Sequence, residues 1–310
     1  MSRLDHTIHA EKHHFGWDNS LRPALEAEPG QSVEFEVSDA SGGQLSRESN
    51  RADVGSLDFS RVNPVTGPVF VKGAHPGDVL EVEILDFGPL SWGWTGIVPG
   101  FGLLADEFPE PYLKIWDLSR QWAQFAPGIE VPLKPFPGTI GVALPEPGVH
   151  SVVPPRQNGG NMDIRHLTRG TRLLLPVWVE GALFSLGDTH AAQGDGEVCG
   201  TAIEAPMSIA VRFQLHQGPS LQEPRYIIAG PPTPEADAKG YYVTTGFAPD
   251  LKQAAQKAVC YQIEHLVSEY GLSREEAYAL CSVAVDLRIS EVVDAPHWLV
   301  SAFLPRAIFR

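Results

Sequence analysis

Residues Ser32-Val-Glu-Phe-Glu-Val37 alternate polar and apolar side chains, and Pro29-Gly30 supplies a turn directly before them. Alternation with a period of two predicts a β-strand that buries one face. Val79-Leu-Glu-Val-Glu-Ile-Leu85 follows the turn residues Pro76-Gly-Asp78 with a similar pattern. These two stretches decide the fold class, because the rhythm of short strands and tight turns that they set continues along most of the chain.

The rest of the chain up to residue 250 keeps this rhythm. Its 310 residues include 30 glycines and 27 prolines, which interrupt this part too often for long helices. Further apolar runs between turn residues predict strands at residues 67–72, 139–143, 172–179 and 207–215. We therefore expect a mainly β body, a sandwich or barrel, over residues 1–250, and a different region over residues 251–310.

The region after residue 250 is expected to be a helical hairpin with terminal strands, packed on the β body as α+β elements. Residues 251–270 place apolar side chains at helical spacing, and Gly271 follows as a residue that commonly ends helices. Ser273 and Glu276 form the Ser-x-x-Glu pattern of a capping box, which predicts a second helix.

One segment is repeated within the body. Pro68-Val-Phe-Val-Lys-Gly-Ala74 resembles Pro176-Val-Trp-Val-Glu-Gly-Ala182, and a Gly-Asp pair follows each, at Gly77-Asp78 and Gly187-Asp188. Two strands with similar turns can look alike by chance, but the extent of the match favours a diverged duplication. The two copies would cover about residues 60–90 and 168–200. Only the second copy continues into histidine and closely spaced acidic residues, so we expect the chemistry there.

Charge and composition exclude several classes of partner. The 38 acidic residues outnumber the 23 basic ones, for a net charge of -15, which disfavours nucleic acid and anionic membranes and suits a neutral or cationic small ligand. No apolar run is long enough to cross a membrane, and residues 1–14 lack the apolar core of a signal peptide. The three scattered cysteines indicate reduced thiols. We expect a soluble, cytoplasmic protein.

The densest polar cluster is Asp188-Thr-His-Ala-Ala-Gln-Gly-Asp-Gly-Glu197, with Glu204 shortly after it. Asp188 and His190 are two residues apart and share one face if the preceding strand continues. A carboxylate and an imidazole that converge suit a divalent metal such as zinc, or an acid–base pair. A solvated loop with Asp-Gly turn chemistry explains the same spacing equally well.

A second cluster, Gly159-Gly-Asn161-Met-Asp163, follows a tight turn. Asp163 is a candidate metal ligand, and Asn161 a candidate for binding the carbonyl or amide group of a substrate; an ordinary Asx turn is the alternative. The chain lacks the G-x-S-x-G elbow of α/β-hydrolases and the glycine-rich phosphate loops. Cys199 has no activating base nearby in sequence, so we interpret it as a buried or bystander thiol.

Six motifs in this order resemble those of the acetamidase/formamidase family, from about residue 17 to residue 305. They are Asn63-Pro-Val-Thr-Gly-Pro68, Gly73-Ala-His-Pro-Gly-Asp78, Pro137-Gly-Thr-Ile-Gly141, Gly159-Gly-Asn-Met-Asp163, Gly187-Asp-Thr-His-Ala-Ala-Gln-Gly-Asp-Gly-Glu197 and Asp286-Leu-Arg-Ile-Ser290. The resemblance implies hydrolysis of short amides such as formamide or acetamide, and a jelly-roll-like β body with α+β elements. It also implies a homo-oligomer, a dimer or larger. By carry-over, the polar site comprises Asp163, Asp188, His190, Glu197 and Glu204.

Within this family reading we expect metal-assisted hydrolysis. Zinc is the expected ion, with calcium and magnesium as alternatives, and its expected ligands are His190, Asp163, Asp188 and Glu204. We expect catalysis from Glu197 as the proton-transferring base, together with His190 and Asp188. The expected substrate-binding residues are Asn161, Gln193 and Asp195.

Two alternatives stay open at this point. Within enzymes, the alternative is a metal-free carboxylate mechanism, or hydrolysis of another C–N bond in a lactam, a urea or a carbamoyl compound. Outside enzymes, it is a non-catalytic β-sandwich that binds small polar ligands, with the Asp-Gly cluster holding a structural calcium ion.

Overall fold

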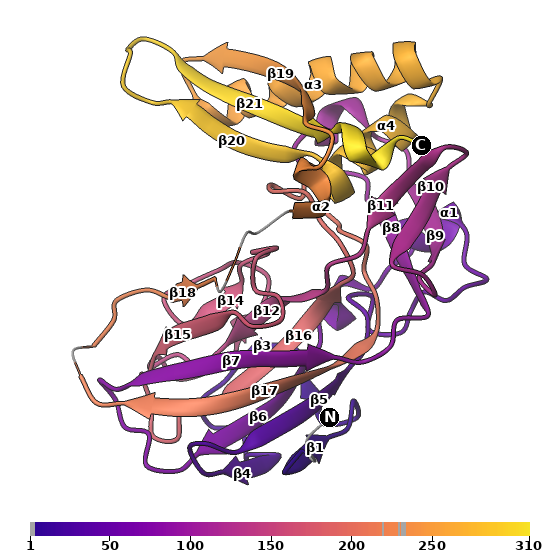
Figure 1. Ribbon diagram of the computed structural model, residues 1–310. Coiled ribbons are helices and arrows are strands. Elements are labelled where there is room, and N and C mark those ends of the chain that lie inside the picture. Colours follow the sequence, from indigo (N-terminus) through magenta and orange to yellow (C-terminus); the bar gives the residue numbers. More distant parts are fainter. Residues whose placement is uncertain (1–3, 219, 229, 231–233) are drawn as a thin grey trace.

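Two six-stranded β-sheets pack face to face in the lower half of Figure 1. The computed structural model describes residues 4–218, 220–228, 230 and 234–310. The first sheet has the strand order β1 (His6–Ile8), β5 (Ser32–Val37), β17 (Met207–His216), β7 (Val79–Phe87), β15 (Arg172–Pro176) and β18 (Arg225–Ile227). The second has the order β14 (Gly159–Asn161), β12 (Phe136–Gly141), β16 (Phe184–His190), β6 (Val65–Val71) and β2 (His13–His14), with β4 (Leu25–Ala27) also paired to β6.

Alternating side chains explain how the two sheets meet. In β5 the apolar residues are buried, whereas Glu34 and Glu36 between them are half-buried. Phe184 of the second sheet lies 5.7 Å from Phe35 and 5.1 Å from Phe213 of the first, measured between ring centroids. Because edge-to-face aromatic pairs of this kind bury large areas, they help to hold the two sheets together.

The mainly β prediction is confirmed. All six strands that the sequence predicts are present, as β5, β6, β7, β12, β15 and β17, with some of their ends shifted by a few residues. Within the described residues no sheet closes on itself, so the body is a sandwich rather than a barrel.

Smaller elements flank the sandwich, and the sequence patterns predict none of them. Two hairpins are formed by β8 (Trp92–Ile97) with β9 (Tyr112–Asp117) and by β10 (Trp122–Ala126) with β11 (Ile129–Pro132). A short pair joins β3 (Gly16–Trp17) to β13 (His150–Ser151), and the short helices are α1 (Arg51–Gly55) and the 3-10 turns Phe59–Arg61, Ala105–Glu107 and Arg306–Ile308. Figure 1 shows both hairpins beside the sandwich, at the right.

The C-terminal unit, at the top of Figure 1, combines helices with a three-stranded sheet. The sheet order is β19 (Tyr241–Ala248), β21 (Trp298–Pro305) and β20 (Asp286–Glu291), and the helices are α2 (Pro234–Asp237), α3 (Leu251–Tyr270) and α4 (Arg274–Ala284). α3 packs across β19 and β21. Gly246 permits this approach, because a Cβ there would lie 2.2 Å from the Ala254 carbonyl oxygen. The unit includes β19 and so begins before residue 250.

The predicted helix boundaries are confirmed. Gly271 adopts a left-handed φ of 66° after α3, and its N–H donates to the Val267 carbonyl oxygen. Ser273 and Glu276 form the reciprocal hydrogen bonds of a capping box at the start of α4. These local bonds satisfy backbone groups that a helix end otherwise leaves without partners.

The two large sheets have related strand orders. The order β5-β17-β7-β15 in the first corresponds to β14-β12-β16-β6 in the second. β6 pairs with β16 and β15 pairs with β7, so each of the two similar segments contributes one strand to each sheet. A duplicated unit with exchanged strands would give this arrangement, and the duplication itself stays a prediction.

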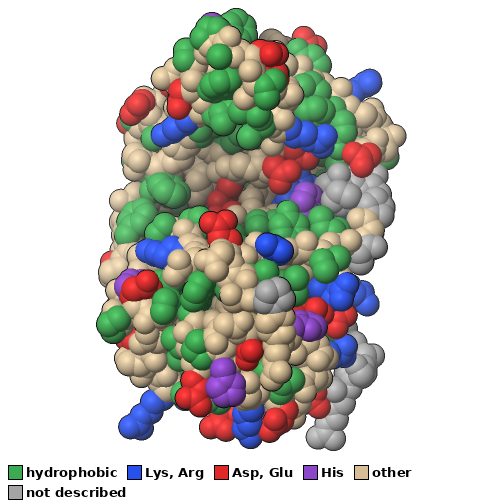
Figure 2. Space-filling view, turned by 90° about the vertical axis from the view of Figure 1, so that its left-hand side faces the viewer, with side chains coloured by type: hydrophobic (Ala, Val, Ile, Leu, Met, Phe, Trp, Pro, Cys, Tyr) green, Lys and Arg blue, Asp and Glu red, His purple; other side chains and the backbone are tan. Residues whose placement is uncertain are grey.

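The surface between the two large parts of the molecule is hollowed. Figure 2 shows this hollow between the C-terminal unit and the sandwich, with hydrophobic and acidic side chains around it. All three cysteines are free thiols. Among the described residues, no helix has the length and hydropathy needed to span a bilayer.

Candidate active site

Strand β16 supplies the centre of the polar site. Asp188 and His190 lie at its C-terminal end on one face, with His190 Nε2 3.3 Å from Asp188 Oδ1, as their spacing predicts. Both are buried, at 3% and 1% exposure. β16 lies between β12 and β6, and Phe136 of β12 packs edge-on against the His190 ring, 5.0 Å away. An ionisable pair is thereby held inside the sandwich.

The chain after β16 folds back and returns a carboxylate to His190. Glu204 forms a backbone bridge opposite His190, and its Oε2 lies 3.1 Å from His190 Nε2. The Ala202 N–H donates to Glu204 Oε1 at 2.8 Å and fixes the carboxylate. The loop from residue 191 to residue 203 therefore joins two ends of one site.

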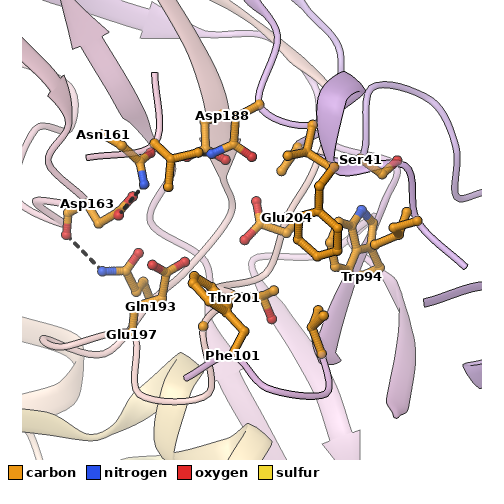
Figure 3. Close-up of a pocket in the computed structure, with 18 of the residues that line it drawn as sticks. Ser41, Trp94, Phe101, Asn161, Asp163, Asp188, Gln193, Glu197, Thr201 and Glu204 are labelled. Atoms are coloured by element: carbon orange, nitrogen blue, oxygen red, sulfur yellow. Dashed lines mark hydrogen bonds between the residues drawn. The ribbon is translucent and has the colours of Figure 1, made fainter. Parts of the chain in front are cut away.

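Two further carboxylates reach the site from loops. Glu197 Oε1 lies 4.0 Å from His190 Nε2, and only 16% of the Glu197 side chain is exposed. Asp163, just after β14, accepts a hydrogen bond at Oδ2 from Asn161 Nδ2 at 2.9 Å. Figure 3 shows Asn161 and Asp163 on one side of the pocket, with Asp188 and Glu204 farther across it.

The backbone is unusual at this site. Four of the six non-glycine residues with positive φ in the described part of the chain belong to it, namely Asn63, Asp163, Asp188 and Glu197, at φ of 50°, 50°, 53° and 43°. Left-handed conformations are costly for residues with a Cβ and persist where the surroundings hold them. They orient these four side chains toward one another.

Gln193 determines which nitrogen of His190 carries a proton. Gln193 Nε2 donates to the Asp163 carbonyl oxygen at 2.8 Å, so Gln193 Oε1 faces His190 Nδ1, 2.9 Å away. An amide oxygen only accepts, so Nδ1 must be the donor. In neutral His190 the lone pair at Nε2 then points toward the carboxylates of Asp188 and Glu204. A proton or a cation must lie among these acceptors.

The pKa values of the cluster also indicate that its carboxylates need a proton or a cation among them. Burial, together with the charge of Asp188, raises the pKa of Asp163 to about 7. Burial, with the Asp163 charge, raises the pKa of Glu197 well above its usual value, and burial also raises the pKa of Glu204. Burial acts to lower the pKa of His190, but the charges of Glu204 and Asp188 outweigh it and raise that pKa well above normal.

The cluster has the donor atoms and spacing of a divalent metal site. Asp163, His190 and Glu197 form one group of donor atoms that all lie within 4.8 Å of each other, and Asp188, His190 and Glu204 form another. Asp163 Oδ1 and Glu204 Oε2 are buried without a hydrogen-bond partner, although the latter lies close to His190 Nε2. Buried polar atoms normally have partners, and a coordinated ion would supply them.

Gly138 leaves the space for such an ion. A Cβ at this position would lie 2.6 Å from Asp163 Oδ1, 2.7 Å from His190 Cε1 and 2.9 Å from Asp188 Oδ2. Any side chain here would enter the space between the three side chains. The residues present therefore fit a bound divalent cation.

A cavity of about 580 Å³ opens beside the cluster. Its walls include the predicted site residues Asn161, Asp163, Asp188, Gln193, Glu197 and Glu204. His190 does not line the cavity itself but contacts Asp188, Gln193 and Glu204. Two residues that the sequence places near the site do not line it, Asp195 and Cys199. Asp195 lies 4.0 Å from His166, and its N–H donates to Asp286. Burial raises the pKa of the Cys199 thiol, as expected for a bystander.

Sequence reasoning missed three residues of the site. Asn63 Nδ2 donates to Asp188 Oδ2 at 3.2 Å, Thr139 Oγ1 lies 3.2 Å from the same oxygen, and Gly138 makes room beside it. Asn63 and Thr139 lie in motifs that the family resemblance singled out, but their local patterns indicate only a turn and a strand. Their role depends on pairing between distant strands.

Comparison with known proteins now identifies the family. The model described as the acetamidase/formamidase family matches residues 3–151 and 146–310. The formamidase of Methylophilus methylotrophus is 29% identical over 96% of this chain and 89% of that protein. The γ-lactamase from Delftia acidovorans superimposes with a TM-score of 0.91 at 28% identity, over 98% of this chain and 93% of that one. The acetamidase from Bacillus halodurans superimposes with a TM-score of 0.69 at 32% identity, over 96% of both chains. The chain belongs to the acetamidase/formamidase family.

Proposed function

We propose that the protein hydrolyses the C–N bond of neutral amides to a carboxylate and ammonia, with formamide and acetamide as the substrates that the family name suggests. The observation that carries the proposal is the buried cluster of Asp163, Asp188, His190, Glu197 and Glu204 beside an open cavity. Such a cluster is costly to bury for structure alone, because its carboxylates repel one another and two of their oxygens have no hydrogen-bond partner.

The residues proposed to hold a divalent cation are His190, Asp163, Asp188 and Glu204. The chemistry that such an ion supplies is polarisation of a carbonyl group and acidification of water. Zinc is the proposed ion, because an imidazole ligand suits zinc better than calcium or magnesium, which prefer all-oxygen sites.

Glu197 is the proposed general base. Its raised pKa suits a group that takes a proton from water and returns it at neutral pH. Glu197 would accept one proton from the attacking water as the water oxygen bonds to the amide carbon. It would then deliver that proton to the nitrogen as the C–N bond breaks and ammonia leaves. His190 and Asp188 would hold the positive charge of the site in place.

Asn161 and Gln193 each retain one N–H for a substrate. Asn161 Oδ1 accepts from Thr139 at 2.5 Å and one of its N–H groups binds Asp163, whereas Gln193 bridges His190 and the Asp163 backbone. Both line the cavity, so their second N–H is the proposed contact for an amide oxygen. Asp195 lies outside the cavity, and we do not assign it to substrate.

The test combines activity with metal content. Ammonia release from formamide and acetamide should be measured with purified protein, before and after chelation and after zinc is returned. Elemental analysis of the same samples should find one or more zinc ions per chain, and chelation should abolish turnover. Full activity in metal-free protein would overturn the metal assignment alone. Absence of turnover on every amide would favour a non-catalytic binding module.

Hydrolysis of a lactam is the second candidate. The backbone superimposes on the γ-lactamase with a TM-score of 0.91 and on the acetamidase with 0.69, although the sequence identities are 28% and 32%. Ring opening of a γ-lactam gives an amino acid and no ammonia. An assay for new primary amine therefore separates this activity from amidase activity, and urea and carbamoyl compounds belong in the same panel.

Two further proposals concern the cellular compartment and the oligomeric state of the protein. Three free thiols suit a reducing compartment, and we propose the cytoplasm. We also propose a homo-oligomer, and light scattering of the purified protein would measure its mass.

A further inference from the structure

The cavity beside the cluster is large for formamide or acetamide. Its volume of about 580 Å³ falls within the range of sites that enclose drug-sized ligands, roughly 300–1,000 Å³. A molecule of acetamide would occupy a small fraction of it. The remaining wall would stay in contact with water during the reaction.

Much of that remaining wall is apolar. The apolar side chains that line the cavity include Phe59, Val62, Trp94, Val98, Phe101 and Met162. In Figure 3 Trp94 lies across the pocket from Asp163 and Asn161, with Glu204 between them, and Phe101 lies along its lower edge. The cavity therefore has a polar end for an amide group and an apolar end for whatever the amide carries.

The apolar end is partly fixed and partly open to water. Trp94 is 3% exposed, and its Nε1 donates to Asp39 at 2.9 Å, which holds the ring in place. Phe59 and Phe101 are 60% and 48% exposed. Exposed aromatic side chains gathered around one cavity are typical of a binding surface that a ligand covers.

We propose that the preferred substrate is an amide with a bulky apolar acyl group, about the size of a six-membered carbon ring. The amide would lie at the carboxylate cluster, and the ring would lie between Trp94 and the exposed faces of Phe59 and Phe101. This inference rests on the proposed amidase function and specifies its substrate class.

The test compares primary amides of increasing acyl size. Acetamide, isobutyramide, cyclohexanecarboxamide and phenylacetamide share an unconjugated carbonyl group, so their intrinsic reactivity differs little. One methylene group in an apolar pocket changes kcat/KM by roughly 10–200-fold. We expect kcat/KM for the two ring amides to exceed that for acetamide by at least about tenfold. A steady fall in kcat/KM with acyl size would overturn the proposal.

A matched pair of variants locates the effect. Phe59→Ala should reduce the ratio of kcat/KM for cyclohexanecarboxamide over acetamide by about tenfold, since it removes one apolar wall. Phe247→Ala removes the same side chain at nearly the same exposure, 59%, on β19 and away from the cavity, so it should leave the ratio unchanged. Equal ratios in Phe59→Ala and the parent protein would also overturn the proposal.

Equilibrium binding separates this inference from the amidase proposal. If no amide is hydrolysed, the amidase proposal fails, and calorimetry with phenylacetamide still tests the pocket. Binding that Phe59→Ala weakens at least about tenfold and Phe247→Ala leaves unchanged would support the ligand class. Turnover of acetamide without binding or turnover of phenylacetamide would sustain the amidase and overturn the ligand class.

Discussion

Glu197 has a left-handed backbone conformation, and its carboxyl group is buried near the charge of Asp163. These features hold a carboxyl group with a raised pKa at the edge of the cavity, 4.0 Å from His190. A general base must both reach the substrate and match its pKa to neutral pH. Glu197 is the most accessible of the three carboxylates nearest His190, because 16% of its side chain is exposed, against 4% for Asp188 and 3% for Glu204.

Replacing Glu197 by glutamine tests this role. Glu197→Gln keeps the size of the side chain but removes its ability to take a proton, so kcat should fall by about 100-fold or more. Steady-state kinetics on the best amide and circular dichroism would measure activity and folding. Glu11→Gln, on the exposed N-terminal segment, serves as the control and should retain the parent rate. A Glu197→Gln variant with parent activity would remove Glu197 from the mechanism.

Gln193 should act on the metal through His190. Gln193→Leu conserves volume but loses both hydrogen bonds, so zinc affinity should weaken by roughly 10–100-fold. Gln193→Glu retains an acceptor for His190 Nδ1 and should weaken it less. Competition with a chromophoric chelator measures these dissociation constants independently of activity. Equal zinc affinities in the parent and Gln193→Leu would rule out this positioning role.

Gly138→Ala should prevent binding of the proposed cation. The new Cβ would lie under 3.0 Å from atoms of Asp163, His190 and Asp188, all of which are held by neighbours. We expect zinc content and turnover to fall together while the fold is kept, as judged by circular dichroism. Gly55→Ala is the matched control, because its Cβ would meet only Pro111 at an ordinary 3.8 Å. Normal zinc binding by Gly138→Ala would place the ion elsewhere.

At the scale of elements, alternation of side chains located the main strands of the sandwich and failed for the hairpins that flank it. β5, β7 and β17 have one face toward the core, and that asymmetry is written in the sequence. β8 and β9 flank the sandwich, and Trp92-Gly-Trp-Thr-Gly-Ile97 has no alternation to reveal it. Its glycine Gly93 instead permits the backbone of Glu204 to approach. Contacts of this kind are not encoded locally.

The part of the site that comes from one continuous segment of the chain could be predicted from the sequence. Asp188 and His190 lie at the end of one strand and Glu197 lies shortly after it, so their density was visible in the sequence. Asn63 and Thr139 reach Asp188 only because β12 pairs with β16 and the chain before β6 runs beside it. The register between strands so far apart could not be read from either segment. For the same reason Asp195 looked like part of the site, although its loop points it toward the C-terminal unit.

The capping box of α4 should contribute measurably to stability. Ser273→Ala removes the side-chain acceptor for the Glu276 N–H and should lower the free energy of unfolding by about 1 kcal/mol. Urea denaturation followed by circular dichroism would measure it. Ser273→Thr retains a hydroxyl and should lose less. A neutral Ser273→Ala change would show that packing of the buried α4 face alone fixes the helix.

For the whole molecule, the cluster predicts how stability depends on pH. A group whose pKa is higher in the folded than in the unfolded chain binds its proton more tightly when folded, so stability is lost as pH rises through the folded value. The pKa of Asp163 is raised to about 7, and those of Glu197, Glu204 and His190 are also raised. All four groups therefore act in the same direction.

Metal-free protein should accordingly be less stable at pH 8.5 than at pH 6. These two pH values lie on either side of about 7, to which the pKa of Asp163 is raised. Zinc should restore the stability at high pH, because the ligands bind it when deprotonated. Chemical denaturation of chelator-treated and zinc-loaded samples would measure both effects. Asp163→Asn should flatten the pH dependence of the metal-free protein. Greater stability of metal-free protein at the higher pH would contradict the charge balance argued for the site.

The exchanged strand orders of the two sheets support a duplication for the whole body, which we propose. In that scheme β16 corresponds to β7, and β17 corresponds to β12. The histidine and the carboxylates of the site then belong to one copy, since β7 is followed by the β8–β11 insertion rather than by a loop of carboxylates. A search for weak similarity between the two halves across many related sequences would test the scheme.

The position of β17 between β5 and β7 also has a consequence for synthesis on the ribosome. β5 and β7 have no direct pairing in the first sheet, and the strand that joins them begins only at Met207. The roughly 120 residues after Phe87 take roughly 6 to 24 s to translate at about 5–20 residues per second. Throughout that interval the nascent chain has two unpaired, β-prone edges. Until residue 216 has emerged, these edges are available for pairing with other chains.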